Sequence, residues 1–309
     1  MIVTLTLNPS LDYTIRMDEL RPGVLNRAKA EDLHPGGKGI NVSRVLHGLG
    51  HESRALGFTA GFTGAEIERQ LAQDGLMTDF VRTAGLSRIN VKVKAGEETE
   101  INGAGPLITR DDEEKLFKKL DGLEEGDWLV LSGSVPRGLE KEVYARIMRR
   151  LRGKGIHIVA DAEGEALRAA LAEGPFLVKP NGSELAGLLG VPAATREEAV
   201  PCALRLLEMG AENALISLGG EGAVLAAADG CVYTCPAPQG RVVDTVGAGD
   251  SMVAGFIAGW LESGGDCRRA LRTGVAAGSA SAFSEGLATG EAVRRTLQTV
   301  AEAGKAETV

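Results

Sequence analysis

The segment from Asp244 to Ser251 combines small residues with acids in an order suited to proton transfer beside an anion. It has the sequence DTVGAGDS and leads into a predicted helix over residues 248–261. The backbone amides from Gly247 to Asp250 lie at the positive end of that helix and can bind an anion. Asp250 can then accept a proton from a hydroxyl group that attacks this anion. The spacing also fits a simpler role, a first-turn acid that complements the helix dipole.

A second glycine-rich segment, PGGKGIN at residues 35–41, also begins a predicted helix, over 39–49. It lacks the Ser or Thr that follows the lysine of a Walker A loop, and it lacks the G-x-G-x-x-G spacing of a dinucleotide-binding loop. Gly37, Lys38 and Asn41 can still bring backbone, a cation and an amide against a polyhydroxy ligand. The alternative is a glycine turn with a solvated lysine.

Three further segments follow predicted strands. Asp12 in LNPSLD comes after the first strand, at the edge where open α/β sheets bind ligands, although an Asx turn explains it equally well. Asn181 in VKPNGSEL is either a ligand-binding amide or a helix N-cap. The segment SLGGEG at 217–222 predicts a glycine-rich hairpin, which is a weak signal by itself.

Short apolar runs alternate with amphipathic helical patterns, which predicts an α/β fold with a mostly parallel sheet covered on both faces. Strands are expected at 2–7, 128–131, 156–160, 177–178 and 214–218, and further helices at 268–284 and 291–303. Residues 13–30 break this pattern. So does the alternating run 89–94, which turns at Ala95-Gly96 and returns through 98–102. These two insertions predict one small β-lid at the edge of the body.

Composition excludes several classes of protein. The net charge of the 309 residues is 34 − 42 = −8, without the basic balance of a nucleic-acid binder. The four cysteines show no C-x-x-C spacing, so a structural zinc site is not expected. The N-terminal sequence has no basic region before an apolar one, and no apolar run approaches about 18 residues. We therefore expect a soluble cytoplasmic protein with neither nucleic-acid nor membrane partners.

The chain resembles the ribokinase-like carbohydrate kinases, also called the PfkB family. The resemblance rests on seven segments taken together and in this order: LNPSLD, GGKGINVSRVL, SRINVK, SGSVPRG, VKPNGSEL, SLGGEGA and DTVGAGDSMVAGF. The resemblance extends from Thr4 to about Leu287, and TLNPSLD and SRINVK are typical of its phosphosugar branch. It implies a Rossmann-like sheet sandwiched by helices, with residues 1–10, 31–87 and 104–309 as the core. Residues 11–30 and 88–103 would form the lid, through which a homodimer is expected.

The resemblance also implies roles for single residues. The base is Asp250, and the anion hole comprises the amides of Gly247, Ala248, Gly249 and Asp250. Sugar-contacting positions are Asp12, Gly37, Lys38 and Asn41, and the positions near the substrate's own phosphate are Arg88, Asn90 and Arg27. The positions that line ATP are Lys179, Asn181, Ser217, Gly219 and Gly222, together with Gly247 and Gly249. Glu184 is the acid of an N-x-x-E motif that organises water-coordinated Mg²⁺.

The activity that the resemblance implies is ATP-dependent phosphorylation of fructose 1-phosphate to fructose 1,6-bisphosphate. The nearest alternative is a tagatose-6-phosphate kinase that makes tagatose 1,6-bisphosphate. A non-catalytic sugar-phosphate sensor is more remote, because the aspartate and glycines of the DTVGAGD segment are intact. A nicotinamide oxidoreductase is disfavoured by the missing G-x-G-x-x-G after the first strand.

Overall fold

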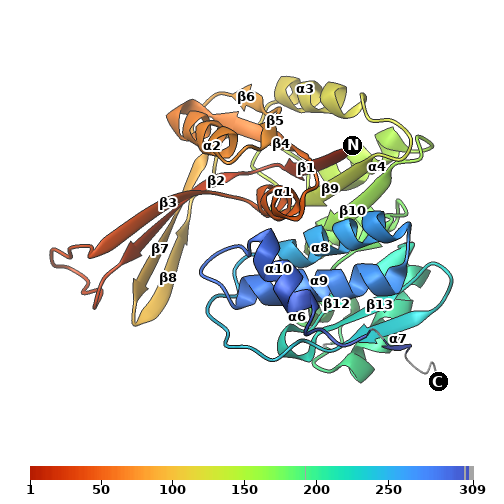
Figure 1. The fold of residues 1–309 in the computed structure, drawn as a ribbon. Coiled ribbons are helices and arrows are strands. Elements are labelled where there is room, and N and C mark those ends of the chain that lie inside the picture. Colours follow the sequence, from red (N-terminus) through yellow and green to blue (C-terminus); the bar gives the residue numbers. More distant parts are fainter. Residues whose placement is uncertain (192, 303, 306–309) are drawn as a thin grey trace.

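The strand β1 (Ile2–Thr6) lies between β4 and β9 in the main sheet of the computed structural model, which describes residues 1–191, 193–302 and 304–305 (Figure 1). Along the sheet the order is β15-β14-β13-β12-β11-β10-β9-β1-β4-β5, and β6 pairs with β4. Pairing is parallel from β12 to β5 and antiparallel from β12 to β15. The remaining bounds are β4 (Arg54–Ala60), β5 (Met77–Thr78), β6 (Val81–Thr83), β9 (Trp128–Ser132), β10 (His157–Asp161), β11 (Leu177–Val178), β12 (Asn213–Ser217), β13 (Ala223–Ala226), β14 (Val232–Cys235) and β15 (Gly304–Lys305). This confirms the mostly parallel sheet.

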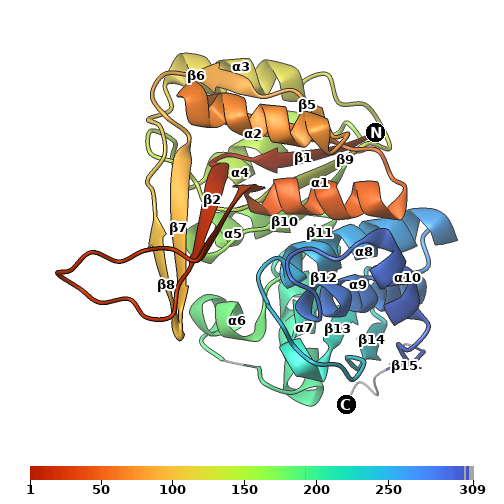
Figure 2. The same cartoon turned by 60° about the vertical axis from the view of Figure 1, so that its left-hand side comes forward.

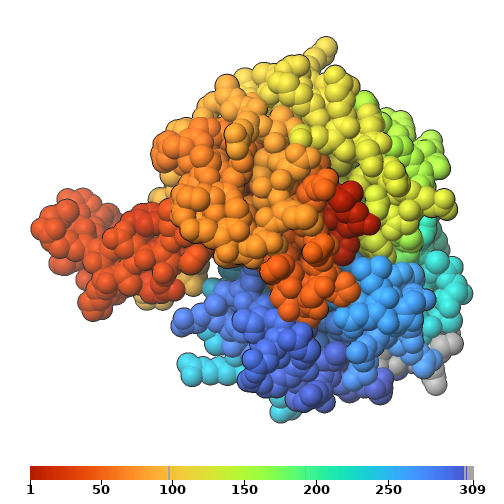
Figure 3. Space-filling view, turned by 45° about the horizontal axis from the view of Figure 1, so that its top comes forward, coloured from red at the N-terminus to blue at the C-terminus, as the bar shows by residue number. Residues whose placement is uncertain are grey.

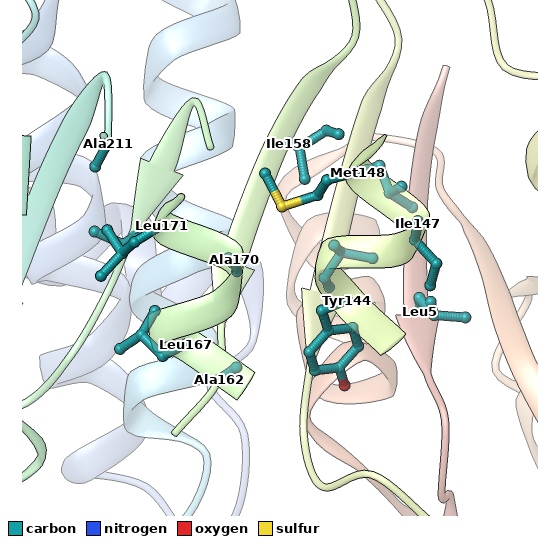
Figure 4. Close-up of a cluster of buried hydrophobic side chains, with 14 of the residues drawn as sticks. Leu5, Tyr144, Ile147, Met148, Ile158, Ala162, Leu167, Ala170, Leu171 and Ala211 are labelled. Carbon is teal, nitrogen blue, oxygen red and sulfur yellow. The ribbon is translucent and has the colours of Figure 1, made fainter. Parts of the chain in front are cut away.

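The central strands are mostly apolar because both of their faces are buried. In β9, Leu129 and Leu131 pack into one hydrophobic core, while Trp128 and Val130 pack into the other. Figure 4 shows part of the first core, where Tyr144 and Ile147 of a covering helix lie beside Leu5 of β1. The sheet is therefore held between two packed hydrophobic cores, and the ends of its strands are rigid supports for polar side chains.

Helices cover both faces of the sheet (Figures 1 and 2). One core contains residues from α3 (Arg110–Leu120), α4 (Val143–Leu151), α5 (Gly164–Leu171), α6 (Gly182–Leu189) and α7 (Arg196–Glu208). The other contains residues from α1 (Lys38–Leu49), α8 (Ala248–Ser263), α9 (Cys267–Ala282) and α10 (Gly290–Leu297). The helix α2 (Gly61–Gln73) packs on a smaller cluster near the lid, and η1 (Gly219–Glu221) is a short 3₁₀ turn. Across the described residues, no helix combines the length and apolar character that crossing a membrane requires.

The last predicted helix is wrong in its length. The helix α10 ends at Leu297, whereas the sequence predicted helix through residue 303, which itself lies outside the described residues. The chain makes a turn at Thr296–Thr299, held by the amides of Gln298 and Thr299, and then buries Val300 in the core. Burial of Val300 explains the early end of the helix.

The predicted lid is a separate four-stranded sheet that projects from the body (Figures 2 and 3). Its order is β3-β2-β7-β8, with β2 (Ser10–Arg16), β3 (Ala30–Gly36), β7 (Arg88–Ala95) and β8 (Glu97–Asn102). The hairpin of β7 and β8 matches the predicted one. The strand β3 pairs with β2 along its whole length, so the lid sheet includes residues 31–36, which the sequence placed in the core.

Candidate active site

A cavity of about 380 Å³ lies where the lid meets the body, and most of the predicted site residues line it. They come from the lid strands β2 and β7, from the beginnings of α1 and α8, from the segment that runs from β11 into the first turn of α6, and from the end of β12. The predicted residues on its wall are Asp12, Gly37, Lys38, Asn41, Arg88, Asn90, Lys179, Asn181, Glu184, Ser217, Gly247, Gly249 and Asp250. Segments from both ends of the chain therefore meet in one cavity.

Asp250 lies in the first turn of α8 and is 6% exposed. Gly247 caps that helix with a φ of 76°, a left-handed conformation that favours glycine. The side-chain amide of Asn41 donates to Asp250 Oδ2 over 2.7 Å. Burial, followed by the charge of Asp161, raises the pKa of Asp250 to about 6, while Asn41 and two nearby lysines oppose the shift. The result is a fixed carboxyl group poised to accept a proton near neutral pH.

Asp161 belongs to the same site, although it is not among the residues that the sequence predicted. It ends β10 and is 1% exposed, and neither of its carboxylate oxygens has a hydrogen-bond partner within the described residues. The Lys179 ammonium lies 3.4 Å from Oδ1, and the Lys38 ammonium lies 3.6 Å from Oδ2. A signal in the sequence could have identified Asp161. It directly follows the predicted strand at 156–160, at the same sheet edge that suggested a role for Asp12.

The glycines of the GGKG segment let the start of α1 approach β1 closely. Gly37 has a φ of 130°, and a Cβ atom there would lie 2.6 Å from Thr6 Cγ2. The Thr6 hydroxyl accepts a hydrogen bond from the Ile40 amide at 3.1 Å, which fixes this start of the helix. Lys38 therefore points into the cavity from a rigid support, so the glycine turn with a solvated lysine does not describe it.

Lys38 stays charged despite its partial burial. Burial lowers the pKa of Lys38, but the carboxylates of Asp161, Asp250 and Glu184 outweigh this effect, so its pKa is raised. Glu163, an exposed residue after β10, lies 3.5 Å from the same ammonium group. The cavity thus holds a permanent cation beside the buried Asp250.

On the lid side, three polar groups hold Asp12 in place. The Ser10 hydroxyl donates to Asp12 Oδ1 at 2.7 Å, and the Asn90 amide donates to the same oxygen at 3.0 Å. The Lys92 ammonium lies 3.8 Å from the other oxygen, Oδ2. Because Oδ1 already accepts two hydrogen bonds, Oδ2 is the oxygen left to accept from a ligand hydroxyl group.

Arg88 is the lid's cation in this cavity. Its Nε donates to the Asn8 carbonyl oxygen at 2.9 Å, and burial lowers its pKa although Asp12 opposes the shift. Among the described residues, no carboxylate lies within ion-pair distance of Arg88, which suits a site for an incoming anion. Arg27 differs: it is exposed in the loop between β2 and β3 and does not line the cavity of this chain.

A second cavity of about 430 Å³ adjoins the first across Ser217 and Gly249. The predicted residues Gly219, Gly222 and Ala248 line it, so the glycine-rich turn after β12 and the start of α8 face the same space. Its apolar wall comprises Val242, Met252, Val275 and Phe283. An apolar cavity beside the amides of a helix start fits an aromatic base attached to a phosphate chain.

Asn181 is a helix N-cap, as the simpler hypothesis predicted, and it also lines the main cavity. Its side-chain oxygen accepts from the amides of Ser183 and Glu184, while Glu184 Oε2 accepts from the Asn181 amide at 2.9 Å. The Lys179 side chain is 5% exposed and lies close to Gly249. A Cβ atom added at Gly249 would be 3.1 Å from the Lys179 ammonium group. The described residues contain no cluster of three acidic, histidine or cysteine side chains that could bind a metal ion.

The chain matches the model of the pfkB family carbohydrate kinases over residues 5–293. It is 45% identical to the 1-phosphofructokinase of Bacillus subtilis, over 97% of this chain and 98% of that one. It is 40% identical to the D-tagatose-1-phosphate kinase of Bacillus licheniformis, over 93% and 94% of the two chains. The crystal structure of phosphofructokinase-2 from Escherichia coli with substrates and products superimposes with a TM-score of 0.90 at 31% identity, covering 96% of this chain and 98% of that chain.

Proposed function

The chain belongs to the PfkB family of carbohydrate kinases, and we propose that it transfers the γ-phosphoryl group of ATP to the C6 hydroxyl group of fructose 1-phosphate. The products are fructose 1,6-bisphosphate and ADP. One observation carries the proposal: the buried carboxyl group of Asp250 shares a single cavity with the cations Lys38, Arg88 and Lys179. A site of this kind pairs a base with groups that bind two phosphorylated substrates.

In the proposed reaction Asp250 takes the proton of the C6 hydroxyl group. The oxygen then forms a bond to the γ-phosphorus, and the bond from that phosphorus to the bridging oxygen of ADP breaks. The amides from Gly247 to Asp250 and the ammonium groups of Lys38 and Lys179 balance the charge on the transferring group. Because the transition state of such reactions is loose, positioning supplies much of the catalysis.

The sugar would lie between the lid and α1. The free oxygen of Asp12 and the backbone at Gly37 face its hydroxyl groups, and Asn41 lies between the sugar and the base. The guanidinium of Arg88 suits the C1 phosphate, because it offers several N–H donors and has no carboxylate counter-ion among the described residues. This arrangement presents the opposite end of the sugar, C6, to Asp250.

Mg²⁺ is the metal ion expected with ATP, and the donor set fits it. Mg²⁺ commonly binds through one or two carboxylates, water and substrate phosphates, so a cage of protein ligands is not needed. Glu184 lines the cavity and uses Oε2 for the Asn181 amide, so Oε1 remains for a water of the metal. When bound, Mg²⁺ would neutralise charge on the β- and γ-phosphates.

Tagatose 1-phosphate is a second candidate substrate, with a specific observation in its favour. The alternative that the sequence suggested, tagatose 6-phosphate, carries its phosphate at the other end of the sugar and finds only weak support. Two relatives are named D-tagatose-1-phosphate kinase, at 40% and 32% identity. Tagatose 1-phosphate keeps the phosphate on C1 and differs from fructose 1-phosphate only in configuration at C4, so the same phosphate contact serves both.

Substrate preference is the first test. We expect kcat/KM, measured as Mg²⁺-dependent ADP release, to be about 100-fold higher for fructose 1-phosphate than for tagatose 1-phosphate, or about 2.7 kcal/mol at the transition state. Tagatose 6-phosphate and fructose 6-phosphate serve as controls with the phosphate at C6. The reverse preference would assign the tagatose activity, and turnover of none of the four would refute the kinase proposal.

The raised pKa of Asp250 predicts an acid limb in the pH profile. A base is active only when deprotonated, so activity should fall as the pH drops through the pKa of about 6. We expect kcat/KM for the sugar phosphate to fall about tenfold per pH unit below that midpoint and to level off above it. A profile flat down to pH 4.5, with the enzyme still folded by circular dichroism, would contradict the assignment.

The outer face of the lid supports the expected homodimer. Leu33, Ile89 and Ile101 share the lid face that points away from Asn90 and Lys92, and they are 38%, 41% and 62% exposed. An apolar sheet face open to water favours pairing with an equivalent face.

We also propose that the protein is located in the cytoplasm.

A further inference from the structure

The tip of the lid touches the body through an ion pair that the proposed reaction does not use. Lys94 lies near the end of β7, and its ammonium group is 3.2 Å from Asp244 Oδ2, 150 residues away in the sequence. Both side chains are partly buried, at 34% and 24% exposed. Among the described side chains, Glu98 on β8, at 3.8 Å, is a second carboxylate near this ammonium group. The pair joins the lid sheet to the loop that precedes α8 in the body.

Asp244 uses its second oxygen to shape the loop before α8. Its Oδ1 accepts a hydrogen bond from the Val246 amide at 2.9 Å, and the Val243 amide next to it donates to the Ala282 carbonyl oxygen at 2.8 Å. Burial would raise the pKa of Asp244, but the Val246 amide and Lys94 outweigh it and lower the pKa. Asp244 is therefore a carboxylate at neutral pH. Val246, whose amide it holds, directly precedes Gly247, the first residue of the proposed anion hole.

The same face of β7 also contacts the sugar side of the cavity. Side chains two apart on a strand point to the same face, so Asn90, Lys92 and Lys94 form one row. Asn90 hydrogen-bonds Asp12 at 3.0 Å, and Lys92 lies 3.8 Å from it. One strand therefore carries residues that hold a sugar-binding carboxylate and a residue that contacts the loop preceding the anion hole.

We propose that Lys94 is a positioning residue that couples the lid over the sugar to the anion hole for the phosphoryl group. The sugar phosphate would hold the lid against the body and so stabilise the Lys94–Asp244 pair, and Asp244 in turn keeps the Val246–Gly247 backbone in place for ATP. By thermodynamic linkage, each substrate then strengthens binding of the other. This inference rests on the proposed function for the identity of the two ligands.

The test is binding without turnover, by calorimetric titration of a non-hydrolysable ATP analogue with and without saturating fructose 1-phosphate. In the unmodified enzyme we expect the sugar phosphate to tighten binding of the analogue about three- to tenfold. In Lys94→Gln this enhancement should fall close to onefold, while the affinity for the analogue alone stays unchanged. Asp244→Asn, which keeps an oxygen for the Val246 amide, should give the same result.

The double variant and a matched control complete the experiment. Lys94→Gln with Asp244→Asn should lose no more enhancement than either single variant, because both changes remove one interaction. Lys29→Gln breaks a pair with Asp18 that is confined to the lid and exposed, and it should keep the full enhancement. Unchanged enhancement in folded Lys94→Gln, or an equal loss in Lys29→Gln, would overturn the coupling role. Failure of the sugar phosphate to bind the unmodified enzyme at all would instead refute the proposed substrate.

Discussion

We expect Asp250→Asn to lower kcat by about 10²–10⁴-fold while binding of both substrates changes little. Asn has nearly the same shape and can still contact Asn41, but it cannot take a proton from the attacking hydroxyl group. The loss is bounded because the amides of the anion hole and the nearby lysines continue to position the phosphoryl group. The measurement is ADP release at saturating ATP and sugar phosphate, together with calorimetric affinity for the sugar phosphate.

A matched control separates this role from a simpler one. Asp111 is also an acid in the first turn of a helix, α3, but it is exposed. If Asp250 only complemented a helix dipole, both variants would lose a few tenths of a kcal/mol of stability and keep their activity. We expect Asp111→Asn to be fully active. Asp250→Asn with most of its activity intact would contradict the role as base.

We expect Asp161→Asn to lower the free energy of unfolding by about 3–5 kcal/mol. Lys179 is 5% exposed and pairs with Asp161 at 3.4 Å, so the substitution leaves a buried ammonium group without its counter-ion. Lys38 loses the same partner but is 30% exposed and can reach solvent. Urea denaturation, followed by circular dichroism, measures the change.

Two further variants identify the cause. Glu163→Gln removes the exposed partner of Lys38 and should change the free energy of unfolding by less than about 1 kcal/mol, because exposed ion pairs contribute little. Asp161→Leu combined with Lys179→Met removes both buried charges and should recover most of the stability. If Asp161→Asn unfolds at the same urea concentration as the unmodified chain, the buried pair does not stabilise the fold.

Local signals predicted much of the site. The glycines near Lys38 and Asp250 stand where a helix begins beside a ligand, and a helix start depends on a few adjacent residues. The residues that these segments supply do line one cavity. The capping-box pairing of Asn181 and Glu184 is equally local, so it was visible as one of two hypotheses.

What the sequence did not predict depends on contacts between distant segments. The position of Asp161 at the end of a strand was a signal, but its pairing with Lys38 and Lys179, which lie on other elements, is not visible in the sequence. The end of the lid at residue 36 follows from the pairing of β3 with β2, a register that no local pattern states. Arg27 matched a family position by its neighbours in sequence, whereas in this chain it lies on an exposed loop away from the cavity.

The hydrogen bond between Asn41 and Asp250 joins residues 209 apart, and this separation sets an order on biosynthesis. The lid, α1 and the strands β1, β4 and β9 leave the ribosome first, and α8, with the proposed base and anion hole, follows after most of the chain has been made. A nascent chain therefore contains Asp12 and Arg88, which are proposed to contact the sugar phosphate, before it contains Asp250. A truncated product that ends before α8 would be inactive as a kinase. It would also lack Asp250, so we do not expect it to hydrolyse ATP.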